Sequence, residues 1–149
     1  MLRNSDDHAF NNEYDDKKWY LSISYRKIGG KKKAKFSFAD NGFGILETLR
    51  KKGIWERFRN IFEGIDTTEL VIEAFKGEKS SSTGLPWRGK GLPTILELQS
   101  ENIVKNLVVI SNNVYINFEQ SYKRKLNTSF SGTYYYWEID DTCKKVCFD

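Results

Sequence analysis

The chain has 149 residues, of which 39% are hydrophobic and 15% aromatic, so it can bury the core of one ordinary domain. The absence of a run of about 18 apolar residues excludes a membrane-spanning helix, and the polar first residues lack the apolar region of a secretory signal, which indicates a cytoplasmic protein. The net charge is +4, and basic residues form short runs at 31–33, 50–52 and 123–125, which are typical of solvated turns but keep a nucleic-acid-binding surface open as an alternative.

The first predicted elements are a short polar helix and a β-hairpin. Residues 4–10 are compatible with a helix that carries Asn4, Asp7 and His8, the single histidine of the chain. Residues 19–25, WYLSISY, alternate apolar and polar side chains as a half-buried strand does. Gly29-Gly30 supplies a reversal and residues 34–39 resume the alternation, so a hairpin is predicted.

The second strand of this hairpin runs into the sequence DNGFGI. A carboxylate at the end of a buried strand costs free energy unless a donor meets it, so Asp40 requires a partner. Gly42 and Gly44 can adopt positive φ and leave room for a flat ring against the main chain. An acid that accepts from an exocyclic amine beside such a backbone suits adenine, although DNG is also a common tight-turn sequence.

The middle of the chain predicts helices separated by a loop. Apolar residues recur at helical spacing within 54–62, and Asp66 to Glu69 resembles a capping box before a second helix that contains Leu70 and Phe75. Residues 79–91 are predicted to form a loop, and a helix is predicted over 92–102. Two glycines of RGKGLP precede that helix, where unpaired backbone N–H groups form a cradle for phosphate; the GK[ST] ending of a Walker motif is absent.

The C-terminal third is predicted to be strands. Residues 107–111 and 114–119 flank Asn112-Asn113, which predicts a tight turn, and Gly132-Thr133 opens an aromatic strand at 133–139. Cys143 and Cys147 lie four apart without a second pair or a nearby histidine, which favours free thiols in a reducing compartment. About five strands and three helices predict a single α+β domain, with a mixed, mainly antiparallel sheet covered by helices on one face.

The order of four motifs along the chain resembles that of the GHKL nucleotide-binding superfamily. These motifs are Asn4 on a first helix, DNGFGI after a hairpin, RGKGL after a long loop and GT before a last aromatic strand. The resemblance covers residues 4–139 and is strongest to bacterial stand-alone ATP-binding proteins of the histidine kinase-like type, through NSDDHA, WYL, DNGFGI, SST and RGKGL. It implies the two-layer α/β sandwich of the Bergerat fold over residues 1–149, with ATP and Mg²⁺ as cofactors and a lid at about 46–88.

The resemblance also implies residue roles. Asp40 would accept from the adenine amino group with help from Thr133, and Asn4 would ligate Mg²⁺. The remaining implied nucleotide contacts are Gly42, Gly44 and Ile45 beside the base, Ser82 and Thr83 from the lid, and Arg88, Gly89, Lys90, Gly91 and Leu92 around the β and γ phosphates.

One departure from the family concerns its general base. Hydrolytic members carry a glutamate four residues before the helix asparagine, and counting back from Asn4 gives a position before Met1. Either the protein begins upstream, which the small apolar surface of the first helix favours, or the chain binds nucleotide without its own base. ATP hydrolysis or phosphoryl transfer therefore stays open.

The resemblance predicts an ATP-Mg module in signalling or ATP-driven conformational switching, with a protein partner or a missing domain and no membrane. The alternatives are a basic nucleic-acid-binding module and a degenerate, non-hydrolysing scaffold of the same fold.

Overall fold

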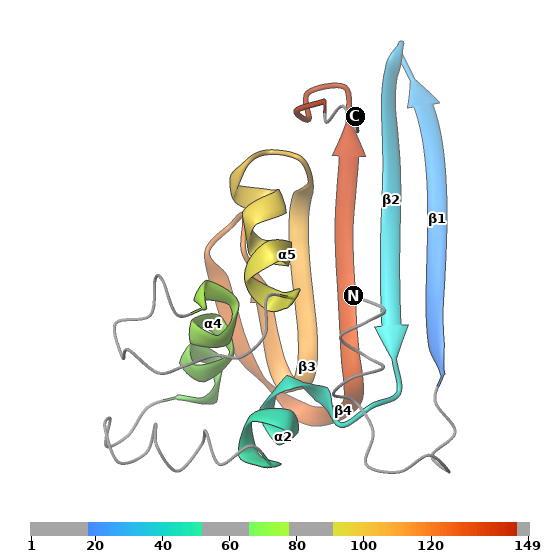
Figure 1. The fold of residues 1–149 in the computed structure, drawn as a ribbon. Helices are drawn as coiled ribbons and strands as arrows, with labels where there is room; N and C mark the ends of the chain where they lie inside the picture. The colour runs from blue at the N-terminus through green and yellow to red at the C-terminus, as the bar shows by residue number, and fades with distance from the viewer. Residues whose placement is uncertain (1–17, 52–65, 78–90, 146–149) are drawn as a thin grey trace.

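A computed structural model describes residues 18–51, 66–77 and 91–145, and the structural statements below concern these residues. Their elements are β1 Trp19–Ile28, β2 Lys31–Asp40, α2 Gly44–Lys51, α4 Thr67–Lys76, α5 Gly91–Ser100, β3 Lys105–Asn117 and β4 Tyr122–Asp140. The strands form one sheet in the order β1-β2-β4-β3, and Figure 1 shows the helices in front of β3 and β4. The described chain is therefore an α+β structure. All three strand pairings are antiparallel, so the expectation of a mixed sheet is wrong for the described strands.

The predicted hairpin is confirmed. β1 and β2 pair from Trp19 with Asp40 to Ile28 with Lys31 without a break in register. Gly29 and Gly30 form the two-residue turn with φ of 57° and 80°, values that glycine adopts without steric cost and that this class of hairpin requires.

The predicted turn at Asn112-Asn113 is wrong, because β3 continues through it. Asn112 has a φ of 54°, but this single left-handed residue produces a bulge instead of a reversal. On β4, residues 126–129 separate the partners of Asn112 and Val114, which are Phe130 and Lys125. β4 consequently begins at Tyr122, well before the predicted start at 133.

The helices α4 and α5 occur where they were predicted, whereas α2 was not anticipated. Asp66 caps α4 as the sequence indicates, since its carboxylate accepts from the backbone N–H of Thr68 at 3.3 Å. Glu69 does not complete the capping box and instead pairs with Lys123 on β4. The predicted helices at 4–10 and 54–62 lie outside the described residues. No helix in the described ranges is long and apolar enough to cross a membrane.

The hydrophobic core lies between the helices and one face of the sheet. The side chains of Leu70, Val71, Phe75 and Leu107 are fully buried there, and their neighbours include Phe38, Leu46, Leu49, Ile95, Val109, Val114, Ile116 and Tyr135. Leu46 and Leu49 of α2 and the buried residues of α4 fall within 46–88, the range predicted as a lid. That assignment stays a prediction.

β1 lies outside this core. All ten of its residues are exposed, so the expectation of a half-buried strand at 19–25 is wrong. The reason is its place in the sheet: β1 is an outer strand, and Figure 1 shows no described helix in front of it.

Candidate functional site

Asp40 and Thr133 meet at the point where β2 ends. They are direct partners in the β2–β4 register although 93 residues separate them, and the Thr133 N–H donates to Asp40 Oδ1 at 3.1 Å. The Gly42 N–H donates to the same oxygen at 3.0 Å. Both side chains are buried, with 6% of Asp40 and 5% of Thr133 exposed. The acid that the sequence singled out therefore receives the donors that its burial requires.

Two glycines allow the backbone to close around this pair. Gly132 has a φ of 110°, and a Cβ placed there would lie 1.9 Å from the Asp40 carbonyl oxygen. Gly44 has a φ of 78°, and its Cβ would lie 2.5 Å from Asn112 Oδ1 and 2.7 Å from the Gly132 carbonyl oxygen. The prediction of a positive φ is confirmed for Gly44. Gly42 is not among the described glycines with positive φ, and its contribution is the N–H group that binds Asp40.

Ser111 and Asn112 hold the start of α2 against this region, and the sequence analysis missed both. Ser111 Oγ accepts the Ile45 N–H at 2.7 Å, and Asn112 Oδ1 accepts the Leu46 N–H at 3.0 Å. Ser111 Oγ also lies 3.3 Å from Thr133 Oγ1. These two side chains do for α2 what an N-cap residue normally does, because they bind N–H groups that lack partners within the helix. The available signal is the polar run 111–113 that interrupts an apolar strand, but the sequence analysis places Ser111 at a strand end and interprets Asn112-Asn113 as a turn.

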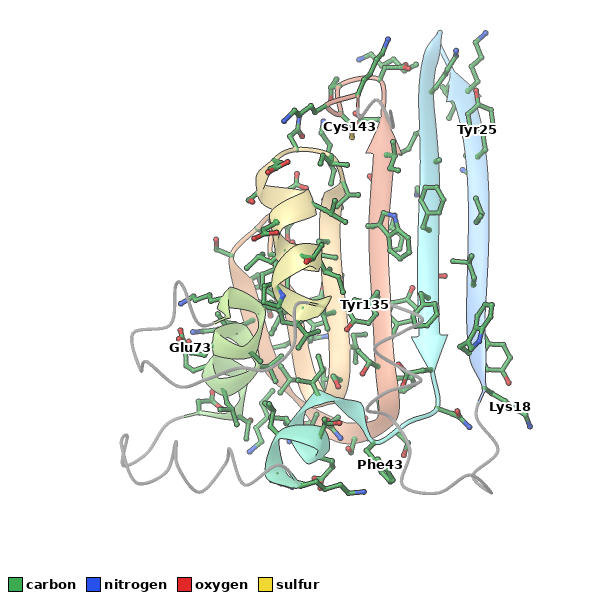
Figure 2. All side chains as sticks on the ribbon, in the orientation of Figure 1. Lys18, Tyr25, Phe43, Glu73, Tyr135 and Cys143 are labelled. Atoms are coloured by element: carbon green, nitrogen blue, oxygen red, sulfur yellow. The ribbon has the colours of Figure 1, made fainter. Side chains whose placement is uncertain are left out.

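The acid also affects its hydrophobic neighbour. Burial, and to a lesser degree the negative charge of Asp40, raise the pKa of the Tyr135 phenol. Tyr135, labelled in Figure 2, connects the site to the core through ring contacts with Phe38 and Phe75, at centroid distances of 6.3 and 6.5 Å. The Asp40 carboxylate therefore lies at the edge of an apolar, aromatic environment in which a hydrogen bond to a charged group is strong. Such a setting suits a purine, whose ring is apolar and whose amino group is a donor.

The start of α5 is directed towards the same end of the sheet. Its C-terminal end is fixed beside the end of β4, because Asn102 Nδ2 donates to the Thr142 carbonyl at 3.0 Å and the Lys144 N–H donates to the Asn102 carbonyl at 2.8 Å. A helix of this length extends about 15 Å back from there, and Figure 1 shows it directed towards the end of the sheet at which β2 ends. Gly91 and Leu92 form the start of the helix, one residue earlier than predicted, and their role in a phosphate cradle stays a prediction.

A third glycine positions α5 against α4. Gly77 ends α4 with a φ of 69°, and a Cβ there would lie 2.7 Å from Pro93 Cγ. The glycine thus allows the C-terminal end of α4 to approach the first turn of α5.

Several implied site residues lie outside the described part of the chain: Asn4, Ser82, Thr83, Arg88, Gly89 and Lys90. Ile45 is described, and it is a buried residue of the core whose N–H binds Ser111. Within the described ranges no cluster of His, Cys, Asp and Glu could hold a metal ion. Cys143 has a free thiol, and Cys147 is not described.

A groove of about 280 Å³ lies on α2 beside the β3 bulge. Its lining residues are Leu46, Glu47, Arg50, Asn112, Asn113, Leu126, Asn127, Thr128 and Ser129. Asp40 and Thr133 do not line it, so this groove is separate from the predicted adenine contacts.

A second buried acid, Glu138, lies on β4 towards the other end of the sheet. Its carboxylate accepts from Lys33 Nζ at 2.7 Å, Asn106 Nδ2 at 2.8 Å and the Tyr136 hydroxyl at 2.5 Å. Burial acts to raise the pKa of Glu138, but these three donors outweigh it and lower the pKa to about 2. Glu138 is therefore a satisfied ion held between strands.

Comparison with protein-family models, with curated proteins and with solved structures found no match to this chain.

Proposed function

We propose that this chain is an ATP-Mg²⁺-binding module with the two-layer Bergerat fold of the histidine kinase-like type. The observation that carries the proposal is the pairing of Asp40 with Thr133 across β2 and β4, inside a backbone that only glycine at 44 and 132 accommodates. The sequence analysis linked Asp40 and Thr133 only through the order of their motifs along the chain. Their contact in space therefore supports the proposal independently of that order.

In this proposal the Asp40 carboxylate accepts from the adenine amino group, and the Thr133 hydroxyl assists directly or through a water. The two backbone N–H groups that bind Oδ1 fix the orientation of the carboxylate before the base arrives. Guanine presents a carbonyl oxygen where adenine presents the amino group, so the same acid would repel it.

The phosphate end of the nucleotide would lie at the N-terminus of α5. The N–H groups of the first helical turn are unpaired within the helix and carry a positive partial charge, which favours phosphate. In this scheme Asn4 would contribute an oxygen ligand to Mg²⁺, and the cation would neutralise phosphate charge. Direct catalysis by the chain is not part of the proposal.

The basic runs give less support to a nucleic-acid surface. Lys33 lies opposite Asp140 at one end of the sheet and is paired with Glu138, whereas Lys51 lies at the end of α2. Lys123 pairs with Glu69. The described members of these runs therefore lie apart, and Lys33, Arg50 and Lys123 already have carboxylate partners.

Calorimetric titration of ATP, with and without Mg²⁺, tests the proposal. We expect Asp40→Asn to weaken ATP binding about 10- to 100-fold, because a hydrogen bond to a charged group is lost. Asp141→Asn is the matched control, since Asp141 accepts from the Lys32 N–H at the hairpin end of the sheet and should leave affinity unchanged. Binding of GTP should be at least tenfold weaker than binding of ATP.

Equal ATP affinity in wild type and Asp40→Asn, in proteins with the same thermal midpoint, would refute the adenine role. Absence of any nucleotide binding would favour a degenerate scaffold. RNA or DNA binding that weakens steeply with salt would favour the nucleic-acid alternative.

A further inference from the structure

The outer strand β1 presents a long apolar edge. Trp19, Leu21, Ile23 and Tyr25, which we call the β1 apolar row, point to the helix-bearing side of the sheet, and 49–61% of each side chain is exposed. Residues 19–25 contain no charged residue, proline or glycine, and the register with β2 shows no bulge. Natural proteins commonly protect a sheet edge with charged residues, proline or a bulge, so an edge of this length that lacks them and that no described element covers indicates a pairing surface.

The backbone groups of the same residues point away from the sheet. The Asn41 N–H donates to the Lys18 carbonyl at 3.1 Å, which makes Lys18 and Asn41 a hydrogen-bonded pair directly beyond Trp19 and Asp40. Such pairs alternate along an antiparallel ladder. The even-numbered residues of β1 therefore bond to β2, and the apolar row together with Lys27 directs its N–H and C=O groups outward.

We propose that β1 pairs antiparallel with β1 of a second copy of this chain, about a two-fold axis at Ile23. In this register Trp19 lies opposite Lys27, Leu21 lies opposite Tyr25 and Ile23 lies opposite itself. All five outward-facing residues then belong to hydrogen-bonded pairs, and the apolar row of one copy continues the row of the other on one side of a continuous sheet.

Charge selects the antiparallel over the parallel orientation of the two copies. Lys27, Lys31, Lys32 and Lys33 surround the hairpin turn, so a parallel arrangement would place two basic turns side by side. The two-fold arrangement separates them by about 30 Å, well beyond the Debye length of about 8–10 Å. It also places Lys27 beside Trp19, and Arg26 beside Tyr20 on the opposite side of the sheet, where cation–π contacts form.

Sedimentation velocity of the full chain without nucleotide, over about 5–500 µM, tests this proposal independently of the proposed function. We expect wild type to be a dimer at the upper concentrations. Ile23→Lys and Ile23→Glu should each be monomeric, since each places like charges against each other on the two-fold axis. A mixture of the two variants should form a heterodimer, because the same position then pairs opposite charges.

Ile139→Lys is the control variant. Ile139 is 38% exposed on β4, on the same side of the sheet as the apolar row but away from the β1 edge. If the dimer forms through the β1 edges, this variant should remain dimeric. A dimer formed instead by packing two sheet faces against each other would be disrupted by it. Circular dichroism and the thermal midpoint of each variant establish that it is folded.

Three outcomes would overturn the proposal. The first is a wild-type chain that stays monomeric at 500 µM, as expected if another part of the chain covers β1. The second is a dimer that survives Ile23→Lys, and the third is a folded mixture of the two variants that does not associate.

Discussion

Replacement of Gly44 by alanine tests whether close packing of α2 against the Asp40 region depends on the missing side chain. Gly30→Ala is a closely matched control, because the φ values of the two glycines are 78° and 80°. The backbone strain of about 1–2 kcal/mol is therefore common to both variants. The surroundings differ: a Cβ at Gly30 meets nothing within 4 Å, whereas at Gly44 it meets three oxygen atoms at 2.5–2.8 Å.

The excess cost at Gly44 follows from these three contacts. Two of them are Asn112 Oδ1 and Ser111 Oγ, which accept the Leu46 and Ile45 N–H groups, and displacing each acceptor costs about 1 kcal/mol. The third is the Gly132 carbonyl oxygen, a backbone atom whose displacement moves β4 and adds about 1–2 kcal/mol of overpacking. Gly44→Ala should therefore be about 3–4 kcal/mol less stable than Gly30→Ala.

Urea unfolding monitored by tryptophan fluorescence measures the difference in unfolding free energy between the two variants. For a domain of this size, the expected difference corresponds to roughly 5–15 °C in thermal midpoint. Ser111→Ala, which removes one of the two acceptors without adding a Cβ, should cost about 1–2 kcal/mol. An equal loss of stability in Gly44→Ala and Gly30→Ala would show that α2 does not pack here as described.

Three further predictions concern single groups. The pKa of Glu138 is about 2 in the folded state against the ordinary 4.5, so its carboxylate contributes stability that is complete above about pH 5 and is lost as the pH falls towards 2. Glu138→Gln should remove on the order of 2–3 kcal/mol of stability at pH 7 and flatten the acid limb of the stability–pH curve. An unchanged curve would contradict this. Asp66→Ala should destabilise the protein by about 1 kcal/mol in urea unfolding, whereas Asp66→Asn, which retains a capping oxygen, should be close to neutral. Phe75→Ala should cost about 3–5 kcal/mol, because removing this fully buried ring, whose centroid lies 4.8 Å from that of Phe118, leaves a cavity. A loss of stability below about 1 kcal/mol would place the ring outside the core.

Local patterns identified those elements whose determinants are adjacent in sequence. The Gly29-Gly30 turn and the alternation on both sides of it are enough to specify a hairpin, and Asp66 marks the start of α4 through atoms two residues away. The same reasoning failed at Asn112, where a residue that tolerates a left-handed backbone was interpreted as a turn. In the folded chain its side chain binds α2, 66 residues earlier in sequence, and this partner is invisible to a local pattern.

The sequence by itself determined the hairpin, the aromatic strands, the helices α4 and α5, and the identity of the acid that needs a donor. The tertiary structure decided that Thr133 supplies this donor and that β1 is an outer strand exposed on both faces. The physical reason is the same in both cases. Periodicity specifies which side of a strand a residue occupies, but strand order and register depend on pairing between distant segments, and that pairing is set by the energy of the whole core.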